Sequence, residues 1–144
     1  MLDGISKAGF LIMVAGIVGL AMTHALFSTN PLVVGTQVAA VVLMVWARIA
    51  FGRRSFHANA TPTAGGLVTS GPYRRIRHPI YTAICLFTVA GALAHPSLRA
   101  ALFIALVFGG ALARMVAEER LVVIEYPEYA DYARRTHRMV PFVF

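Results

Sequence analysis

Long uncharged stretches alternate with short polar ones along the chain. Four stretches contain no Asp, Glu, Lys or Arg: residues 8–27, 31–47, 80–95 and 100–113. A bilayer core of about 30 Å takes about 20 helical residues. The pattern therefore predicts an all-α fold, an integral membrane bundle of about four transmembrane helices near 8–28, 31–51, 79–95 and 97–124.

The polar segments between these helices are unequal in length. The connections at residues 28–30 and 96–97 are too short to build a site, whereas the 52–78 loop and the C-terminal tail after Ala117 are long. Both long segments fall on the same side of the predicted bundle. We expect them to form a cap there and to carry the function.

The basic residues set the expected orientation of the bundle. With the N-terminus inside, twelve of the thirteen Lys and Arg residues lie inside and only Arg99 lies outside. Cytoplasmic segments of membrane proteins carry such an excess. We therefore predict a multi-pass protein with both termini cytoplasmic, and its small size suggests a prokaryotic plasma membrane.

Composition supports a membrane protein and argues against other classes. The chain is 58% hydrophobic and 13% charged, whereas a soluble domain carries roughly 25% charged residues. A net charge of +7 could suggest nucleic acid, but the apolar fraction assigns that charge to a lipid surface, so no nucleic-acid partner is expected. One Cys excludes an intrachain disulfide and a multi-Cys metal site, and no metal site is predicted.

The predicted hairpin of the third and fourth helices brings distant polar residues together. The start of the third helix, residues 77–81, should lie beside the end of the fourth, where Arg114, Glu118 and Glu119 occur. These residues are either interfacial anchors or a functional site. Two adjacent Glu on the basic side, and His78 followed by Pro and Tyr at a helix start, favour function.

The residues around this hairpin resemble the isoprenylcysteine carboxyl methyltransferase family, which is grouped with phospholipid methyltransferases. Residues 67–81, Leu-Val-Thr-Ser-Gly-Pro-Tyr-Arg-Arg-Ile-Arg-His-Pro-Ile-Tyr, carry the first family motif. The second motif is matched by Glu118, Glu119, Tyr129, Tyr132 and Pro141. The resemblance covers residues 52–144, which we expect to be the cofactor-binding catalytic core of a single domain, with residues 1–51 as a helical hairpin scaffold.

The resemblance implies methyl transfer from S-adenosylmethionine to a lipophilic or small acceptor at the cytoplasmic face. The acceptor stays open between a prenylcysteine carboxylate, a phospholipid amine and a thiol. The implied cofactor-binding residues are Leu67, Val68, Tyr73, His78, Pro79, Ile80, Tyr81, Glu118 and Glu119. The implied catalytic residues are Arg114, Glu118 and His78. His78 is a general base if the acceptor must lose a proton and otherwise a binding group.

Other readings of the sequence stay open beside this one. A four-helix transporter needs an acid buried within a helix, and none occurs between Asp3 and Glu118. A structural membrane subunit would use the polar cluster only as an anchor. The tyrosines of the tail form either a lid over the cofactor or an interfacial belt, and His24 and His95 are either polar groups satisfied at helix ends or a haem ligand pair. The oligomeric state is not indicated.

Overall fold

The computed structural model describes residues 2–52, 66–141 and 144. All its regular elements are helices, and these ranges contain no strand. The elements are α1 (Leu2–Met22), α2 (Pro31–Phe51), the 3₁₀ turn η2 (Gly71–Arg74), α3 (Pro79–Ala94), α4 (Leu98–Glu125) and α5 (Tyr129–Arg134). The predicted all-α membrane bundle is confirmed. Residues 53–65 of the 52–78 loop lie outside the described residues.

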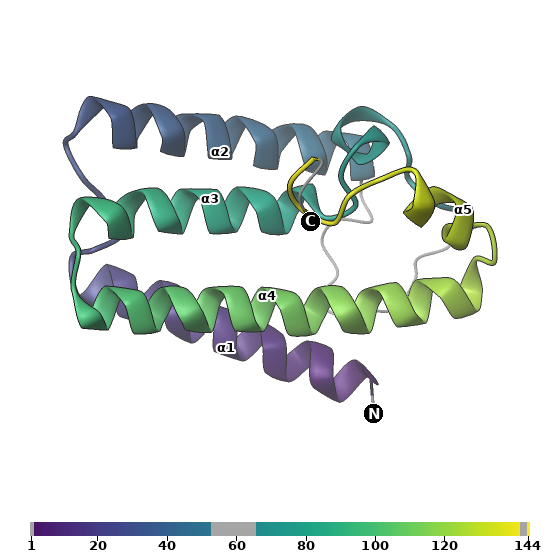
Figure 1. Cartoon of the computed structure of the whole chain (residues 1–144), viewed down its shortest axis with the longest axis horizontal. Helices are drawn as coiled ribbons and strands as arrows, with labels where there is room; N and C mark the ends of the chain where they lie inside the picture. The colour runs from purple at the N-terminus through teal and green to yellow at the C-terminus, as the bar shows by residue number, and fades with distance from the viewer. Residues whose placement is uncertain (1, 53–65, 142–143) are drawn as a thin grey trace.

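The four long helices form two pairs. α1 packs obliquely along α4, and α2 packs along α3 (Figure 1). The two helices expected to form a hairpin scaffold over residues 1–51 therefore lie in different pairs. Three helices, α1, α2 and α4, are long and apolar enough to cross a membrane. α3 is apolar throughout, but its 16 residues span only about 24 Å.

α1 begins and ends about six residues earlier than the sequence predicts. Its first turn contains Asp3, a charge that favours a helix N-terminus, and Lys7 lies 2.7 Å from that carboxylate. At its other end His24 adopts a left-handed conformation with φ 55°. The amide of Ala25 then donates to the carbonyl of Leu20, and that of His24 to the carbonyl of Ala21. This capping arrangement ends the helix within an apolar stretch that gave no stop signal.

The other boundaries agree closely with the sequence because capping residues stand beside them. Asn30 accepts a hydrogen bond from the amide of Leu32, with Pro31 at the first position of α2. Ser97 accepts one from the amide of Ala100 at 3.1 Å, so α4 begins at residue 98. α4 is 28 residues long, about 42 Å, so its last turns extend past the hydrocarbon core of about 30 Å.

Glycines allow α1 and α4 to approach closely. A Cβ atom on Gly9 would lie 2.8 Å from the carbonyl oxygen of Gly110, and one on Gly16 would lie 2.7 Å from that of Phe103. Close approach through small residues is the usual way in which helices associate in lipid. This contact holds α1 against the part of α4 that carries Arg114.

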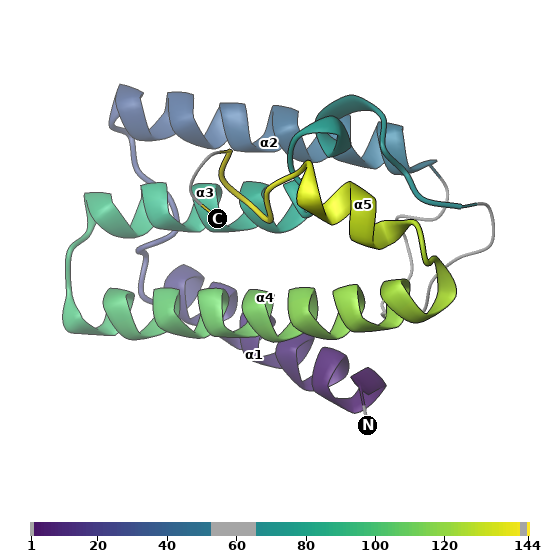
Figure 2. The ribbon, with the colours of Figure 1, turned by 45° about the vertical axis from the view of Figure 1, so that its right-hand side comes forward.

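The long polar segments gather toward one end of the bundle. Figures 1 and 2 show η2 and α5 at the end that also holds the start of α1, whereas the short connections occupy the opposite end. The polar residues of the two long segments therefore meet in one place.

Candidate active site

Two buried polar side chains, Tyr81 and Arg114, and the partly buried Glu118 join α3 to α4 at this end of the bundle. The Tyr81 hydroxyl donates to Glu118 Oε1 at 2.6 Å and accepts a hydrogen bond from Arg114 Nε, also at 2.6 Å. Arg114 Nη2 donates to the same Glu118 oxygen at 3.0 Å. The sequence prediction that residues 77–81 lie beside residues 114–119 is confirmed. Because one oxygen of Glu118 receives both bonds, its carboxylate is oriented from two sides.

Glu119 lies in a different environment from its neighbour. Its Oε1 accepts from Arg77 Nε at 3.0 Å and lies 3.1 Å from His78 Nε2, and its Oε2 accepts from Arg138 Nη2 at 3.0 Å. Three basic side chains thus surround this carboxylate, which is only 13% exposed. Glu119 joins α4 to the residues before α3 and to the C-terminal tail.

His78 stands between the two glutamates. A carboxylate only accepts hydrogen bonds, so the contact with Glu119 requires a proton on Nε2. The other ring nitrogen, Nδ1, lies 3.9 Å from Glu118 Oε2, beyond hydrogen-bond distance. The imidazole therefore directs Nδ1 toward the Glu118 side of the cluster.

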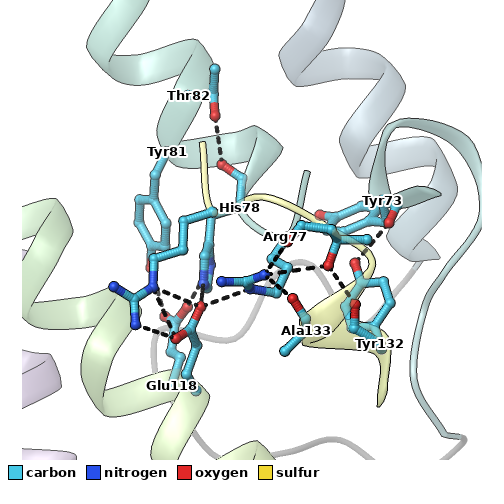
Figure 3. A network of polar contacts seen from close by, with 11 residues as sticks. Tyr73, Arg77, His78, Tyr81, Thr82, Glu118, Tyr132 and Ala133 are labelled. Carbon is cyan, nitrogen blue, oxygen red and sulfur yellow. Dashed lines mark hydrogen bonds and ion pairs between the residues drawn. The ribbon is translucent and has the colours of Figure 1, made fainter. Parts of the chain in front are cut away.

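The C-terminal tail is fastened to the segment before α3. The amides of Arg77 and His78 donate to the carbonyls of His137 and Arg138, and the amide of His137 donates to the carbonyl of Arg75. These bonds form a short parallel bridge. The Arg77 side chain also donates to the carbonyl of Ala133 at 2.9 Å (Figure 3). The tail therefore forms one wall of the cluster.

Two tyrosines extend this wall toward η2. The Tyr132 hydroxyl donates to the carbonyl of Tyr73 at 2.7 Å (Figure 3). The centre of the Tyr73 ring lies 5.5 Å from that of Phe51. Burial raises the pKa of Tyr132 to about 12 and also raises the pKa of Tyr73. Both phenols consequently stay protonated at physiological pH, and Tyr132 remains a hydrogen-bond donor.

The residues singled out from the sequence fall into three groups in the structure. His78, Tyr81, Arg114, Glu118 and Glu119 form one polar network. Tyr73 lies at its edge through Tyr132. Pro79 and Ile80 open α3 beside it, and Leu67 and Val68 lie half-buried in the stretch before η2; these four residues bring apolar surface to this end of the bundle and no polar side chain.

Sequence reasoning missed several residues that build the network. Arg77 lies within the first family motif but was not among the implied site residues, whereas nothing in the sequence marks Arg138 as a partner of Glu119. Ser6 and Phe10 of α1 also reach Arg114: Nη1 lies 3.5 Å from the Ser6 carbonyl oxygen, and the guanidinium lies 5.3 Å from the centre of the Phe10 ring. Among the described residues, no group of three His, Cys, Asp or Glu side chains could hold a metal ion.

The fold and the network together define a class of protein: a helical membrane protein with a polar site assembled at one end from two helices and the tail. The model of the phospholipid methyltransferase family matches residues 32–128, two thirds of the sequence. The chain therefore belongs to the phospholipid methyltransferase family. The family match begins after α1 and ends before α5.

Two curated proteins resemble about half of the chain. A cobalt-zinc-cadmium resistance protein, CzcN, of Cupriavidus metallidurans is 37% identical over 76 residues, and a nickel-cobalt-cadmium resistance protein, NccN, of Alcaligenes xylosoxydans xylosoxydans is 36% identical over 76 residues. The matches cover 52% of this chain but 35% and 36% of the two relatives. The chain thus spans about a third of the length of the curated relatives that it matches. No solved structure is significantly similar to it.

Proposed function

We propose that the protein uses S-adenosylmethionine to methylate a lipophilic acceptor at the end of the bundle where the polar network lies. Three acceptor classes fit a membrane methyltransferase: a prenylcysteine-like carboxylate, a phospholipid amine and a thiol. The observation that carries the proposal is the contrast between the two adjacent glutamates. Glu119 is enclosed by three basic side chains, whereas Glu118 is 22% exposed and is held through a single oxygen.

The residues around Glu118 fit the chemistry of this cofactor. S-adenosylmethionine would supply an electrophilic methyl group on a sulfonium, together with an ammonium group and ribose hydroxyls. A carboxylate binds ammonium or hydroxyl groups through charge-assisted hydrogen bonds, and Glu118 is oriented for this by Tyr81 and Arg114. The aromatic face of Tyr81 suits a cation.

The other residues of the network would align the acceptor. Methyl transfer by direct displacement depends mainly on alignment of the reacting atoms. Arg114, which is 5% exposed, would hold an anionic oxygen of the acceptor. His78 would accept a proton at Nδ1 only for an acceptor that loses one, such as an amine. The wall formed by the tail would exclude water from this end of the bundle.

The proposal is tested by cofactor binding to the protein in detergent. Calorimetry with S-adenosylhomocysteine should show saturable binding to the wild type and at least about tenfold weaker binding to Glu118→Gln, because a charge-assisted bond is worth about 1.5–3 kcal/mol. Glu125→Gln, an exposed position on the same helix, is the matched control and should bind like the wild type. Absence of binding by folded wild type, or equal binding by Glu118→Gln, would contradict the proposal.

A further inference from the structure

α1 presents one face to Arg114 of α4. Ser6, Gly9 and Phe10 are spaced three and four apart and therefore share a side of the helix. A Cβ on Gly9 would lie 3.1 Å from Arg114 Cγ, so the absence of a side chain there lets the arginine stem lie against the helix. Figure 3 shows the faint purple ribbon of α1 beside α4, on the opposite side of the network from Tyr132.

The same face of α1 contacts the guanidinium group of Arg114. Phe10 lies 5.3 Å below it, within the range of a cation–π interaction. The Ser6 carbonyl oxygen lies 3.5 Å from Nη1. With Tyr81 and Glu118 on the other side, Arg114 is held between α1 and α3. Phe10 is 39% exposed and Arg114 only 5%, so Phe10 separates the charged group from the surrounding lipid.

The Ser6 hydroxyl is unusual for a buried polar group. Ser6 is 0% exposed, and its Oγ has no hydrogen-bond partner among the described residues. A buried hydroxyl without a partner is costly, and such groups are rare in native proteins. The hydroxyl stands on the same residue whose carbonyl already faces Nη1. It is therefore an unpaired acceptor on the residue of α1 whose backbone already meets Arg114.

The charges of the network favour an anionic acceptor. The guanidinium groups of Arg77, Arg114 and Arg138 and the carboxylates of Glu118 and Glu119 leave one positive charge before His78 is counted. A sulfonium cofactor adds to this charge. An oxygen anion next to Arg114 would be stabilised there, whereas a protonated amine would be repelled.

We propose that α1, which lies outside the family match, positions Arg114 for a lipophilic carboxylate. Phe10 keeps the plane of the guanidinium fixed at the lipid side. The Ser6 hydroxyl accepts a hydrogen bond from the guanidinium when Glu118 binds the cofactor and the acceptor approaches. Both are positioning residues that act through Arg114. This inference rests on the proposed function and adds to it the side of the site that α1 builds.

The experiment measures two ligands on the same set of proteins. S-adenosylhomocysteine is titrated calorimetrically, and labelled dodecanoate is then bound to the loaded proteins in a non-ionic detergent, with dodecylamine as the chain-matched cationic probe. The variants are Phe10→Leu, Phe10→Tyr and Ser6→Ala. Leu11→Ala, at an exposed position of α1, is the control for a general effect on the helix.

The loaded wild type should bind dodecanoate saturably and dodecylamine weakly. Phe10→Leu should weaken dodecanoate binding about three- to tenfold, and Phe10→Tyr should restore it. Ser6→Ala should weaken it about tenfold without lowering the melting temperature, because the hydroxyl has no partner to lose in the unloaded protein. S-adenosylhomocysteine binding should stay within about twofold of wild type in all variants, and Leu11→Ala should change neither ligand.

The binding experiment gives one result if this inference fails and a different result if the proposed function fails. A wild type that binds no S-adenosylhomocysteine contradicts the proposed function itself. A wild type that binds it but shows no preference for dodecanoate over dodecylamine overturns the α1 inference alone. The inference is equally overturned if Phe10→Leu and Ser6→Ala bind dodecanoate like the wild type, or if they lose both ligands together as a merely structural change would.

Discussion

Adjacent residues on one helix turn have separate roles in this protein. Successive side chains of a helix point about 100° apart, so Glu118 and Glu119 face different neighbours. Glu118 turns toward Tyr81 and Arg114, and Glu119 turns toward Arg77 and Arg138. Under the proposed function the first would bind the cofactor, whereas the second holds the tail.

Replacing Glu119 should therefore loosen the tail. In Glu119→Gln the three basic groups keep their positions but lose the carboxylate between them, and breaking a buried ion pair costs about 3 kcal/mol. We expect a lower melting temperature in detergent and faster proteolysis within residues 129–141. Limited proteolysis followed by mass spectrometry locates the cut.

The exposed ion pair of Asp131 with Arg134 provides the control for Glu119→Gln. Both side chains are largely exposed, at 65% and 76%, and such surface pairs contribute less than about 1 kcal/mol. Asp131→Asn should thus leave the proteolysis pattern unchanged. A Glu119→Gln protein as resistant as Asp131→Asn would show that the tail is held without the ion pairs of Glu119.

The sequence identified most of the network at the level of residues, but not its connections. The hairpin rule brought His78 and Tyr81 next to Glu118, because a short turn makes the two helices antiparallel and so places the start of the third beside the end of the fourth. The partner of Glu119 could not be found this way, since Arg138 reaches it through the path of a tail with no regular pattern. Phe10 was missed because an aromatic residue in an apolar helix carries no signal of what it faces.

At the level of elements, most helix boundaries were predictable, whereas the packing of α1 against α4 and of α2 against α3 was not. Asn30, Ser97 and Pro79 mark helix starts by capping chemistry that is local in sequence. Pairing depends on which face of a helix meets another, and helices that are apolar on all sides lack the polar stripe that reveals it. The glycines of α1 and α4 decide the pairing instead, and their match in space is not visible in the sequence.

Two neighbouring glycines of α4 make this pairing testable. A Cβ on Gly110 would lie 2.4 Å from the Gly9 carbonyl oxygen, whereas a Cβ on Gly109 meets nothing within 4 Å. Gly110→Ala should destabilise the protein by about 1–3 kcal/mol through overpacking. Gly109→Ala removes the same backbone freedom without the clash and should stabilise α4 by about 0.5 kcal/mol.

Thermal unfolding of both variants in the same detergent isolates the contribution of packing to stability. Both variants replace a glycine of α4 by alanine, so the gain in helix propensity is the same in each. A lower melting temperature for Gly110→Ala alone supports the close contact of α1 with α4. Equal melting temperatures would mean that the two helices do not meet at Gly110.

At the scale of the whole molecule, the arrangement of the helices determines which segments lie on the same side of the membrane. The four long helices run back and forth along the bundle, so that α5 and the start of α1 lie at the same end of it (Figures 1 and 2). The excess of basic residues at this end predicts that it is cytoplasmic.

Cysteine labelling in bacterial cells tests this orientation. The native Cys85 is buried, so the wild type should give little background with a membrane-impermeant maleimide. Pro96→Cys, in the short connection between α3 and α4, should be labelled in intact cells. Glu128→Cys, before α5, should be labelled only after the cells are permeabilised. The opposite pattern would reverse the topology.

The position of the fastening residues has a consequence for biosynthesis. Ala133, His137 and Arg138, which hold Arg77 and Glu119 in place, follow all four long helices in the chain. The helices can enter the bilayer before these residues are synthesised. The polar network can form only once this segment has been made, so insertion into the membrane and assembly of the network are separate events in the life of the protein.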